Sequence, residues 1–250
     1  MWHWPAFFGN LVSPYLLAGA WTTLWLSTAS MAIGLCCGMI AALMRLSSKP
    51  ILNLPAFFYI WLMRGTPVLV QLIIIFTALP QIGIRLNVVQ SALLGLGLNE
   101  GAYLAEIIRS GILAVPKGQF DAARSVGMPY PMMMRLIVFP QALRVIVPPL
   151  GNTFNSLLKT SSLASVISMD ELLRRSEVLI QLRFEVLEIL MVAALYYLVF
   201  TTVWGLIQSR IEAYFSRSVA PYHGSRPGPT GRTPGMVEQI EQSLLAHDAQ

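Results

Sequence analysis

The first 44 residues contain no Lys, Arg, Asp or Glu, and this charge-free stretch restricts the fold more than any other feature. Within it, residues 15–44 form an apolar run longer than the roughly 20 residues that a helix needs to cross a bilayer. A soluble domain usually carries about 25% charged residues, whereas 12% of this 250-residue chain is charged and 55% is hydrophobic. The sequence therefore predicts an integral membrane protein.

Four further apolar runs follow, at about residues 54–79, 86–108, 145–169 and 188–208. Strands of a membrane barrel need only about ten residues of alternating polarity, whereas these runs are longer and apolar on all faces. We therefore expect an all-α fold with about five transmembrane helices. The pairs Gly34/Gly38 and Gly97/Gly101 have the GxxxG spacing that lets membrane helices pack closely.

The basic residues predict the orientation of the chain, because Lys and Arg are enriched in cytoplasmic loops. With the N-terminus outside and the C-terminus inside, 11 of the 17 basic residues lie inside, four lie outside and two lie within spans. Arg174, Arg175 and Arg183 on the outer side depart from the pattern.

Polarity divides the chain into three parts. Residues 1–14 form an external or interfacial segment, and residues 15–215 form the transmembrane domain, with a cytoplasmic loop at about 109–144. Residues 216–250 are expected to form a flexible cytoplasmic tail, because 221–235 is rich in Pro and Gly. The net charge is +5, but no basic run or aromatic platform accompanies it, so we expect a lipid bilayer and no nucleic acid as partner.

The loop between the third and fourth runs contains a short predicted helix. Pro116 can begin it, Gly127 can supply a left-handed residue at its end, and Pro129 prevents its continuation. Composition alone leaves two interpretations open. The helix either fits a groove on a soluble partner or is an interfacial helix that only connects two spans.

The spacing in this loop resembles that of one protein family. The segment reads Asp121-Ala122-Ala123, three residues, Gly127, nine residues, and then Ile137-Val138-Phe139-Pro140. It resembles the cytoplasmic signature loop of bacterial ABC importer permeases, which reads Glu-Ala-Ala, three, Gly, nine, Ile-x-Leu-Pro. Asp121 and Phe139 are the two departures.

Other segments resemble the polar-amino-acid uptake branch of that family. They are Arg64-Gly65-Thr66-Pro67 with Gln71, Gly101-Ala102-Tyr103 with Glu106 and Arg109, Gly118-Gln119, Pro140-Gln141-Ala142, and Leu158-Lys159-Thr160-Ser161-Ser162-Leu163, which lacks the usual Asp.

The resemblance implies the ABC importer permease (MetI-like) fold and transport of a polar amino acid across a bacterial inner (plasma) membrane. It also implies a second copy or related permease, two ATPase subunits that bind ATP and Mg, and an extracytoplasmic amino-acid-binding protein. The helix at 115–127 would insert into an ATPase cleft. The implied coupling residues are Gly118, Gln119, Asp121, Ala122, Ala123, Gly127 and Pro140. The chain has no Walker A sequence, so we expect no enzyme activity, cofactor or metal in it.

Polar residues inside the spans are the candidates for a substrate pathway, because an ionisable side chain at the bilayer centre costs about 2.5–3.5 kcal/mol and should face protein or water. These candidates are Arg64, Thr66, Gln71, Asn99, Glu100, Asn152, Asn155 and Lys159.

Several of these candidates have two readings. Glu100 is either a countercharge for the ammonium group or basic side chain of an amino acid, or a structural partner of Lys159 or Arg64. The span can break after Arg64 and free backbone groups for a carboxylate, or merely kink there. Asn152, Asn155 and Lys159 share a helix face, which indicates either a cavity or polar contacts between helices.

Glu106 and Arg109 are interpreted as a structural ion pair at a helix end. An intramembrane enzyme is poorly supported, because His3, His223 and His247 lie in terminal polar segments and no predicted span contains an aspartate. The alternative function is a passive channel or a membrane assembly protein without ATPase coupling. It suits the polar residues in the spans but does not account for the loop signature.

Overall fold

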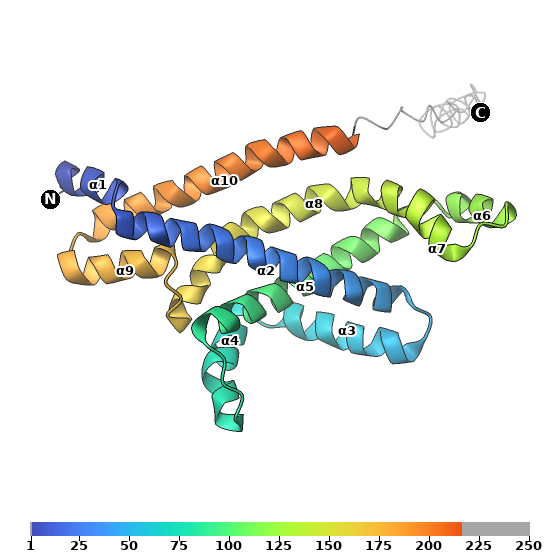
Figure 1. Cartoon of the computed structure of the whole chain (residues 1–250), viewed down its shortest axis with the longest axis horizontal. Helices are drawn as coiled ribbons and strands as arrows, with labels where there is room; N and C mark the ends of the chain where they lie inside the picture. The colour runs from blue at the N-terminus through green and yellow to red at the C-terminus, as the bar shows by residue number, and fades with distance from the viewer. Residues whose placement is uncertain (1, 217–250) are drawn as a thin grey trace, which may run out of the picture. The chain divides into compact units, whose positions relative to one another are not determined.

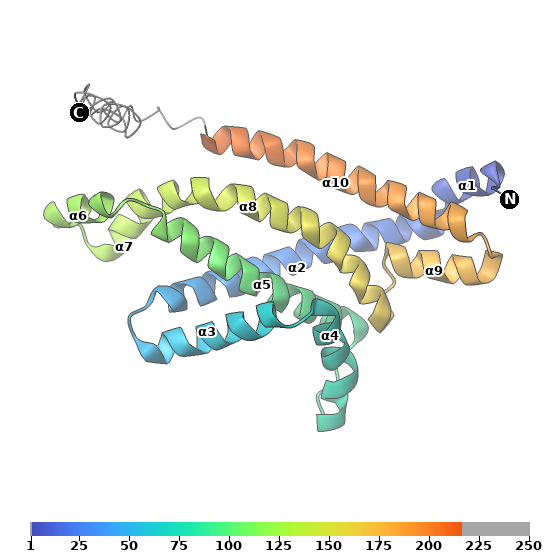
Figure 2. The ribbon, with the colours of Figure 1, turned by 180° about the vertical axis from the view of Figure 1, so that it is seen from behind.

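The computed structural model describes residues 2–216, whose regular secondary structure is entirely helical, as Figure 1 and Figure 2 show. The predicted all-α fold is confirmed. Of the predicted tail, residues 216–250, only Ser216 is described, as the last residue of α10, and the rest lies outside the described residues. The elements are α1 (Trp4–Leu11), α2 (Pro14–Leu46), α3 (Pro50–Gly65), α4 (Val68–Ile73), the π-helix η1 (Ile74–Ala78), the 3-10 helix η2 (Leu79–Ile82), α5 (Val88–Leu113), α6 (Lys117–Ser125), α7 (Tyr130–Met133), the π-helix η3 (Met134–Val138), α8 (Phe139–Thr160), the 3-10 helix η4 (Ser161–Ile167), α9 (Leu172–Arg183) and α10 (Val186–Ser216).

Three stretches among the described residues are long and apolar enough to cross a membrane: Pro14–Leu46, Tyr130–Ile167 and Val186–Phe215. A fourth span is broken, because Pro50–Gly65 and Val68–Ile82 meet at a bend of 105°. The remaining expected span corresponds to α5, which is 26 residues long but is not among the stretches apolar enough to count as a span by composition. Its polar side chains are tolerable because α5 lies among other helices.

The crossing of α2 and α5 forms the centre of the fold (Figure 2). Gly34 and Gly38 of α2 face Gly97 and Gly101 of α5, as the GxxxG spacing predicts. A Cβ atom placed on Gly38 would lie 2.8 Å from the carbonyl oxygen of Gly101, and one on Gly34 would lie 3.2 Å from that of Gly97. The two helices therefore touch backbone to backbone.

The start of α9 joins α2 and α10 at one end of the bundle. Glu171 is fully buried, and its carboxylate accepts hydrogen bonds from the backbone N–H groups of Leu173 (2.9 Å) and Arg174 (2.7 Å). The hydroxyl of Tyr197 in α10 donates to the same carboxylate at 3.0 Å. Thr23 of α2 accepts a hydrogen bond from the backbone of α9, so three helices are fixed at one point.

The three arginines that depart from the expected charge distribution have partners in the structure. Arg175 donates to the carbonyl oxygen of Tyr15 at 3.0 Å and lies over its ring, and Arg183 donates to Asn10 at 2.8 Å. Arg174 lies 3.6 Å from a carboxylate one turn along α9. The guanidinium groups of Arg175 and Arg183 tie α9 to the N-terminal part of the chain.

The N-terminal segment predicted to be external or interfacial forms α1, which packs against α10. The rings of Trp4 and Phe8 stack with centroids 6.0 Å apart, and both side chains are exposed. The hydroxyl of Tyr196 in α10 donates to the carbonyl oxygen of Leu11 at 2.7 Å. Exposed aromatic rings at the end of a span are typical of a membrane–water interface, so the structure is compatible with the predicted position.

Gly38→Ala is expected to lower the free energy of unfolding by about 1–3 kcal/mol, the usual effect of overpacking. The added methyl group would meet main-chain atoms of α5, which cannot move without separating the two helices. The matched control is Gly205→Ala in α10, where a Cβ atom meets nothing within 4 Å. The free energy of unfolding of both purified variants is measured in mixed micelles. Equal stability of the two would contradict a close backbone contact between α2 and α5 at Gly38.

Candidate functional site

The broken span positions the candidate site. Residues Thr66 and Pro67 are extended between α3 and α4, with φ and ψ of −122° and 145° for Thr66 and of −62° and 134° for Pro67. Proline has no N–H to continue the helical hydrogen bonds, and it disfavours a helical conformation in the residue before it. The Gly65-Thr66-Pro67 segment therefore breaks the helix, which is one of the two readings of the sequence.

Two buried amides satisfy backbone groups that the break leaves free. The Gln71 side chain donates to the carbonyl oxygen of Met63 (2.9 Å) and to the hydroxyl of Thr66 (2.8 Å). The Asn99 amide, from α5, donates to the same Met63 oxygen (3.1 Å) and to the side-chain oxygen of Gln71 (3.2 Å). Free carbonyl groups in a membrane need such internal partners, so these amides stabilise the bend.

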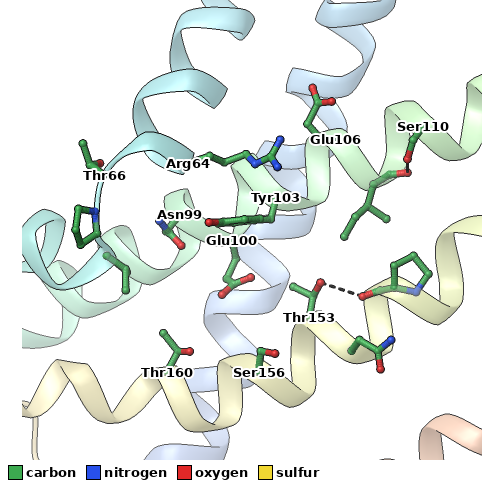
Figure 3. Close-up of a pocket in the computed structure, with 15 residues that line it drawn as sticks. Arg64, Thr66, Asn99, Glu100, Tyr103, Glu106, Ser110, Thr153, Ser156 and Thr160 are labelled. Carbon is green, nitrogen blue, oxygen red and sulfur yellow. Dashed lines mark hydrogen bonds between the residues drawn. The ribbon is translucent and has the colours of Figure 1, made fainter.

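A cavity of about 790 Å³ lies beside the break, between α3, α5 and α8 (Figure 3). It is lined by six of the residues that the sequence assigned to the substrate pathway or to the structural ion pair, namely Arg64, Thr66, Asn99, Glu100, Asn152 and Glu106. The other lining residues are Pro67, Val68, Tyr103, Ile107, Ser110, Pro149, Thr153, Ser156 and Thr160. Gln71 is not part of this lining, because its amide is directed at the backbone of the break.

Glu100 is the central acidic group of the cavity. Its side chain is directed toward the hydroxyl-bearing face of α8 that carries Thr153, Ser156 and Thr160 (Figure 3). The residue is 8% exposed, and within residues 2–216 it forms neither an ion pair nor a side-chain hydrogen bond. The structural pairing with Arg64 or Lys159, one of the two readings of the sequence, is absent from the described residues.

Arg64 supplies a positive charge at the other side of Tyr103. Its guanidinium carbon lies 5.2 Å from the centre of the Tyr103 ring, and the group extends toward Glu106 (Figure 3). The Arg109 guanidinium lies 2.7 Å from the Glu106 carboxylate. Glu106 also lines the cavity, so this ion pair borders the cavity instead of lying apart from it.

The face that α8 presents to the cavity differs from the face singled out in the sequence. Of Asn152, Asn155 and Lys159, only Asn152 lines the cavity. The Lys159 side chain is exposed elsewhere, and Asn155 Oδ1 is buried without a hydrogen-bond partner among the described residues. The hydroxyl-bearing residues Thr153, Ser156 and Thr160 line the cavity but were not assigned to the pathway from the sequence. They have the same i, i+3, i+7 spacing as the assigned residues, and this spacing is the sequence feature that could have identified them.

The short helix expected between the third and fourth spans is present as α6. It is followed by Gly127 in the left-handed conformation, with φ of 72°. The N–H of Gly127 bonds to the carbonyl of Arg124 (2.9 Å), and that of Met128 bonds to the carbonyl of Ala123 (3.0 Å), which is a helix-ending motif that favours glycine. The surrounding connection is shorter than the expected 109–144, because α5 extends to Leu113 and helical structure resumes at Tyr130.

The implied coupling residues divide into an outward and an inward set. Gly118, Gln119, Asp121, Ala122, Gly127 and Pro140 are exposed. Ala123 is 2% exposed and packs in a cluster with Val115, Met133 and Ala142. Only Ala122 of the Ala pair is therefore available to another protein, while Ala123 connects α6 to the helices behind it.

Comparison with known proteins decides the family. Residues 34–217, most of the chain, match the family described as binding-protein-dependent transport system inner membrane component. The chain belongs to this family of ABC importer permeases. The predicted family is thereby confirmed, and the chain is a transporter subunit rather than an enzyme.

This permease has relatives with stated transport roles. It is 38% identical over 228 residues to the arginine transport system permease protein ArgU of Corynebacterium glutamicum, covering 86% of this chain and 72% of that one. It is 40% identical over 208 residues to the L-cystine transport system permease protein TcyB of Bacillus subtilis, covering 83% and 89%. A crystal structure of an amino acid ABC transporter with histidines has 38% identity and a TM-score of 0.76, and the match covers 80% of this chain and 94% of that one. The predicted fold is confirmed.

Gln71→Leu is expected to destabilise this permease by about 1–3 kcal/mol, the cost of leaving a buried polar group unsatisfied. Because the amide supports the bend, uptake of different amino acids should fall by the same factor. The control is Gln181→Leu, at an exposed position of α9. Thermal unfolding and uptake are measured together, and a change in substrate preference without a loss of stability would show that Gln71 acts on substrate instead.

Proposed function

We propose that this permease forms, with a second permease subunit, the pathway for a polar amino acid across a bacterial inner membrane. Two separate ATPase subunits, which bind ATP and Mg, would drive it, and an extracytoplasmic amino-acid-binding protein would deliver the substrate. The observation that carries the substrate class is the cavity beside the broken span, where Glu100 is buried without a partner among the described residues.

The charges around this cavity suit an amino acid. The Glu100 carboxylate can receive an ammonium group, and Arg64 offers a positive charge to a carboxylate group. Hydroxyls of α8, such as those of Ser156 and Thr160, can form hydrogen bonds with polar groups at either end of the amino acid. The names of the relatives, which refer to arginine and L-cystine, support an amino acid but differ in which one.

The exposed polar lining supports a second permease subunit as a partner. Arg64, Asn152 and Ser156 line the cavity and remain exposed on this chain. Ionisable and polar groups at membrane depth should face protein or water and not hydrocarbon. A second permease, either a copy or a related chain, would cover this side and enclose the pathway between the two subunits.

We propose that α6 lies in the cytoplasm and docks on an ATPase subunit, with the N-terminus of the chain outside. The distribution of basic residues supports this orientation, and the outer arginines that depart from it are engaged in contacts. Through Ala123, α6 packs on a cluster that includes Ile108 of α5 and Ala142 of α8. Since α5 and α8 also line the cavity, a movement of α6 would reach the pathway directly.

A passive channel would not need these features of α6. Its exposed residues would have no partner, and its rigid end at Gly127 would have no role. Co-purification separates the two functions, because a channel would not bring down an ATPase in fixed proportion.

Glu100→Gln is expected to lower uptake of a cationic amino acid on the order of tenfold, the factor that corresponds to 1.4 kcal/mol. The loss should be smaller for a neutral amino acid, which presents one positive group instead of two. Uptake by vesicles that contain the assembled transporter measures both. Glu177→Gln on α9, outside the cavity, is the control. If Glu100→Gln transported both amino acids at the wild-type rate, Glu100 would not belong to the pathway.

Gly127→Val should abolish substrate-stimulated ATP hydrolysis while the protein remains in the membrane. A β-branched residue is strained at a φ of 72°, so the end of α6 would be displaced. Gly127→Asn should retain most of the activity, because Asn tolerates this conformation. ATPase activity of the complex in vesicles tests the pair. Normal stimulation in the Val variant would exclude a coupling role for this turn.

A further inference from the structure

The helix α8 has two different faces. Its polar face, with Asn152, Thr153 and Ser156, lines the cavity described above. A second cavity, of about 520 Å³, lies between α2, α8 and α10 and is lined on α8 by Val147, Leu150, Gly151 and Phe154. At about 100° per residue, the rotation of an α-helix, these two sets of α8 residues point in nearly opposite directions. One helix therefore separates a polar cavity from an apolar groove.

The groove offers apolar surface to an occupant. From α2 it is lined by Met31, Ala32, Leu35 and Thr28, and from α10 by Trp204, Gln208 and Ile211. The side-chain donors of this lining are used within the chain. The hydroxyl of Thr28 bonds to the carbonyl of Leu24 (2.8 Å), the indole N–H of Trp204 to that of Gly151 (2.8 Å), and the amide of Gln208 to the side chain of Asn152 (3.0 Å). A polar ligand would find no free side-chain donor there.

The surroundings of the groove indicate which occupant fits. Both α2 and α10 are long apolar spans, and Leu35 of α2 and Ile211 of α10, which line the groove, are themselves exposed. The groove therefore opens toward the apolar surroundings of these two spans. The second permease is proposed on the opposite face of α8, where the polar lining needs cover, so this step depends on that proposal. An empty apolar cavity loses contacts with every atom that lines it, and acyl chains are the apolar material available at this depth.

We propose that the groove between α2, α8 and α10 binds an acyl chain of a membrane phospholipid. The chain packs against Phe154 and Trp204, whose ring centroids lie 4.4 Å apart, and fills the space that separates α10 from α2. The acyl chain thereby completes the packing of α10 along the segment from Trp204 to Ile211, where the protein alone leaves a groove.

The test uses the assembled transporter in vesicles of phosphatidylethanolamine and phosphatidylglycerol that contain a phospholipid with a diazirine on its acyl chain. After illumination, labelled peptides should come preferentially from α2 and α10 at the residues that line the groove. Ala32→Phe, which fills the groove, should reduce this labelling several-fold. Ala194→Phe, at an exposed position of α10 outside the groove, should leave it unchanged. Ala32→Leu serves the same purpose with fewer added atoms if the Phe variant does not fold.

Equal groove labelling in the filled variant and the wild type would overturn the proposal. So would a disulfide between the permeases of an Ala32→Cys complex, because a second subunit would then occupy the groove. Uptake of amino acids by the same wild-type vesicles is measured in parallel. Amino acid uptake without acyl-chain labelling at the groove would refute the lipid site and leave the proposed function intact. Absence of amino acid uptake would contradict the proposed function.

Discussion

The contact between α2 and α5 determines the arrangement of the other helices. At the crossing of Gly34 and Gly38 with Gly97 and Gly101, main-chain atoms of the two helices approach each other so closely that an added Cβ atom would meet them within 2.8–3.3 Å. Between helices in lipid the hydrophobic effect is weak, so close van der Waals contact of this kind supplies much of the association. It sets α5 in the middle of the bundle, where a less apolar helix is sheltered and can present Glu100 to a cavity instead of to hydrocarbon.

The broken span and the cavity are two results of the same local chemistry. Proline and glycine interrupt the helix at 65–67, and interruption within a membrane is tolerable only where the freed backbone groups are satisfied or line a water-accessible space. Here both conditions are met. Gln71 and Asn99 bind the backbone of the break, while Arg64, Thr66 and Glu100 line the adjacent cavity together with Asn99. The polar residues that look costly in the sequence are thus grouped at one place.

Local rules of the sequence predicted much of this, and the remaining features depend on packing. Span lengths and the left-handed Gly127 follow from hydropathy and from the conformational limits of proline and glycine. The break after Arg64 is one of the two readings that the sequence left open, and the structure selects it. The cavity-facing side of α8 does not, because 152/155/159 and 153/156/160 have the same spacing, and only the position of α8 against α3 and α5 selects between them. The inward orientation of Ala123 likewise depends on a cluster formed by distant segments. The polar segment at 109–144 is largely helical because helices extend beyond the apolar part of a span.

The amide pair at the break has a consequence for the empty permease. Since Gln71 and Asn99 already satisfy the carbonyl of Met63, the bent segment does not require a solute to hold its shape. The walls of the proposed pathway are therefore in place before an amino acid arrives. An entering amino acid would exchange its hydration shell for a preformed set of charges and hydroxyls, and little of its interaction energy would go into ordering the protein around it.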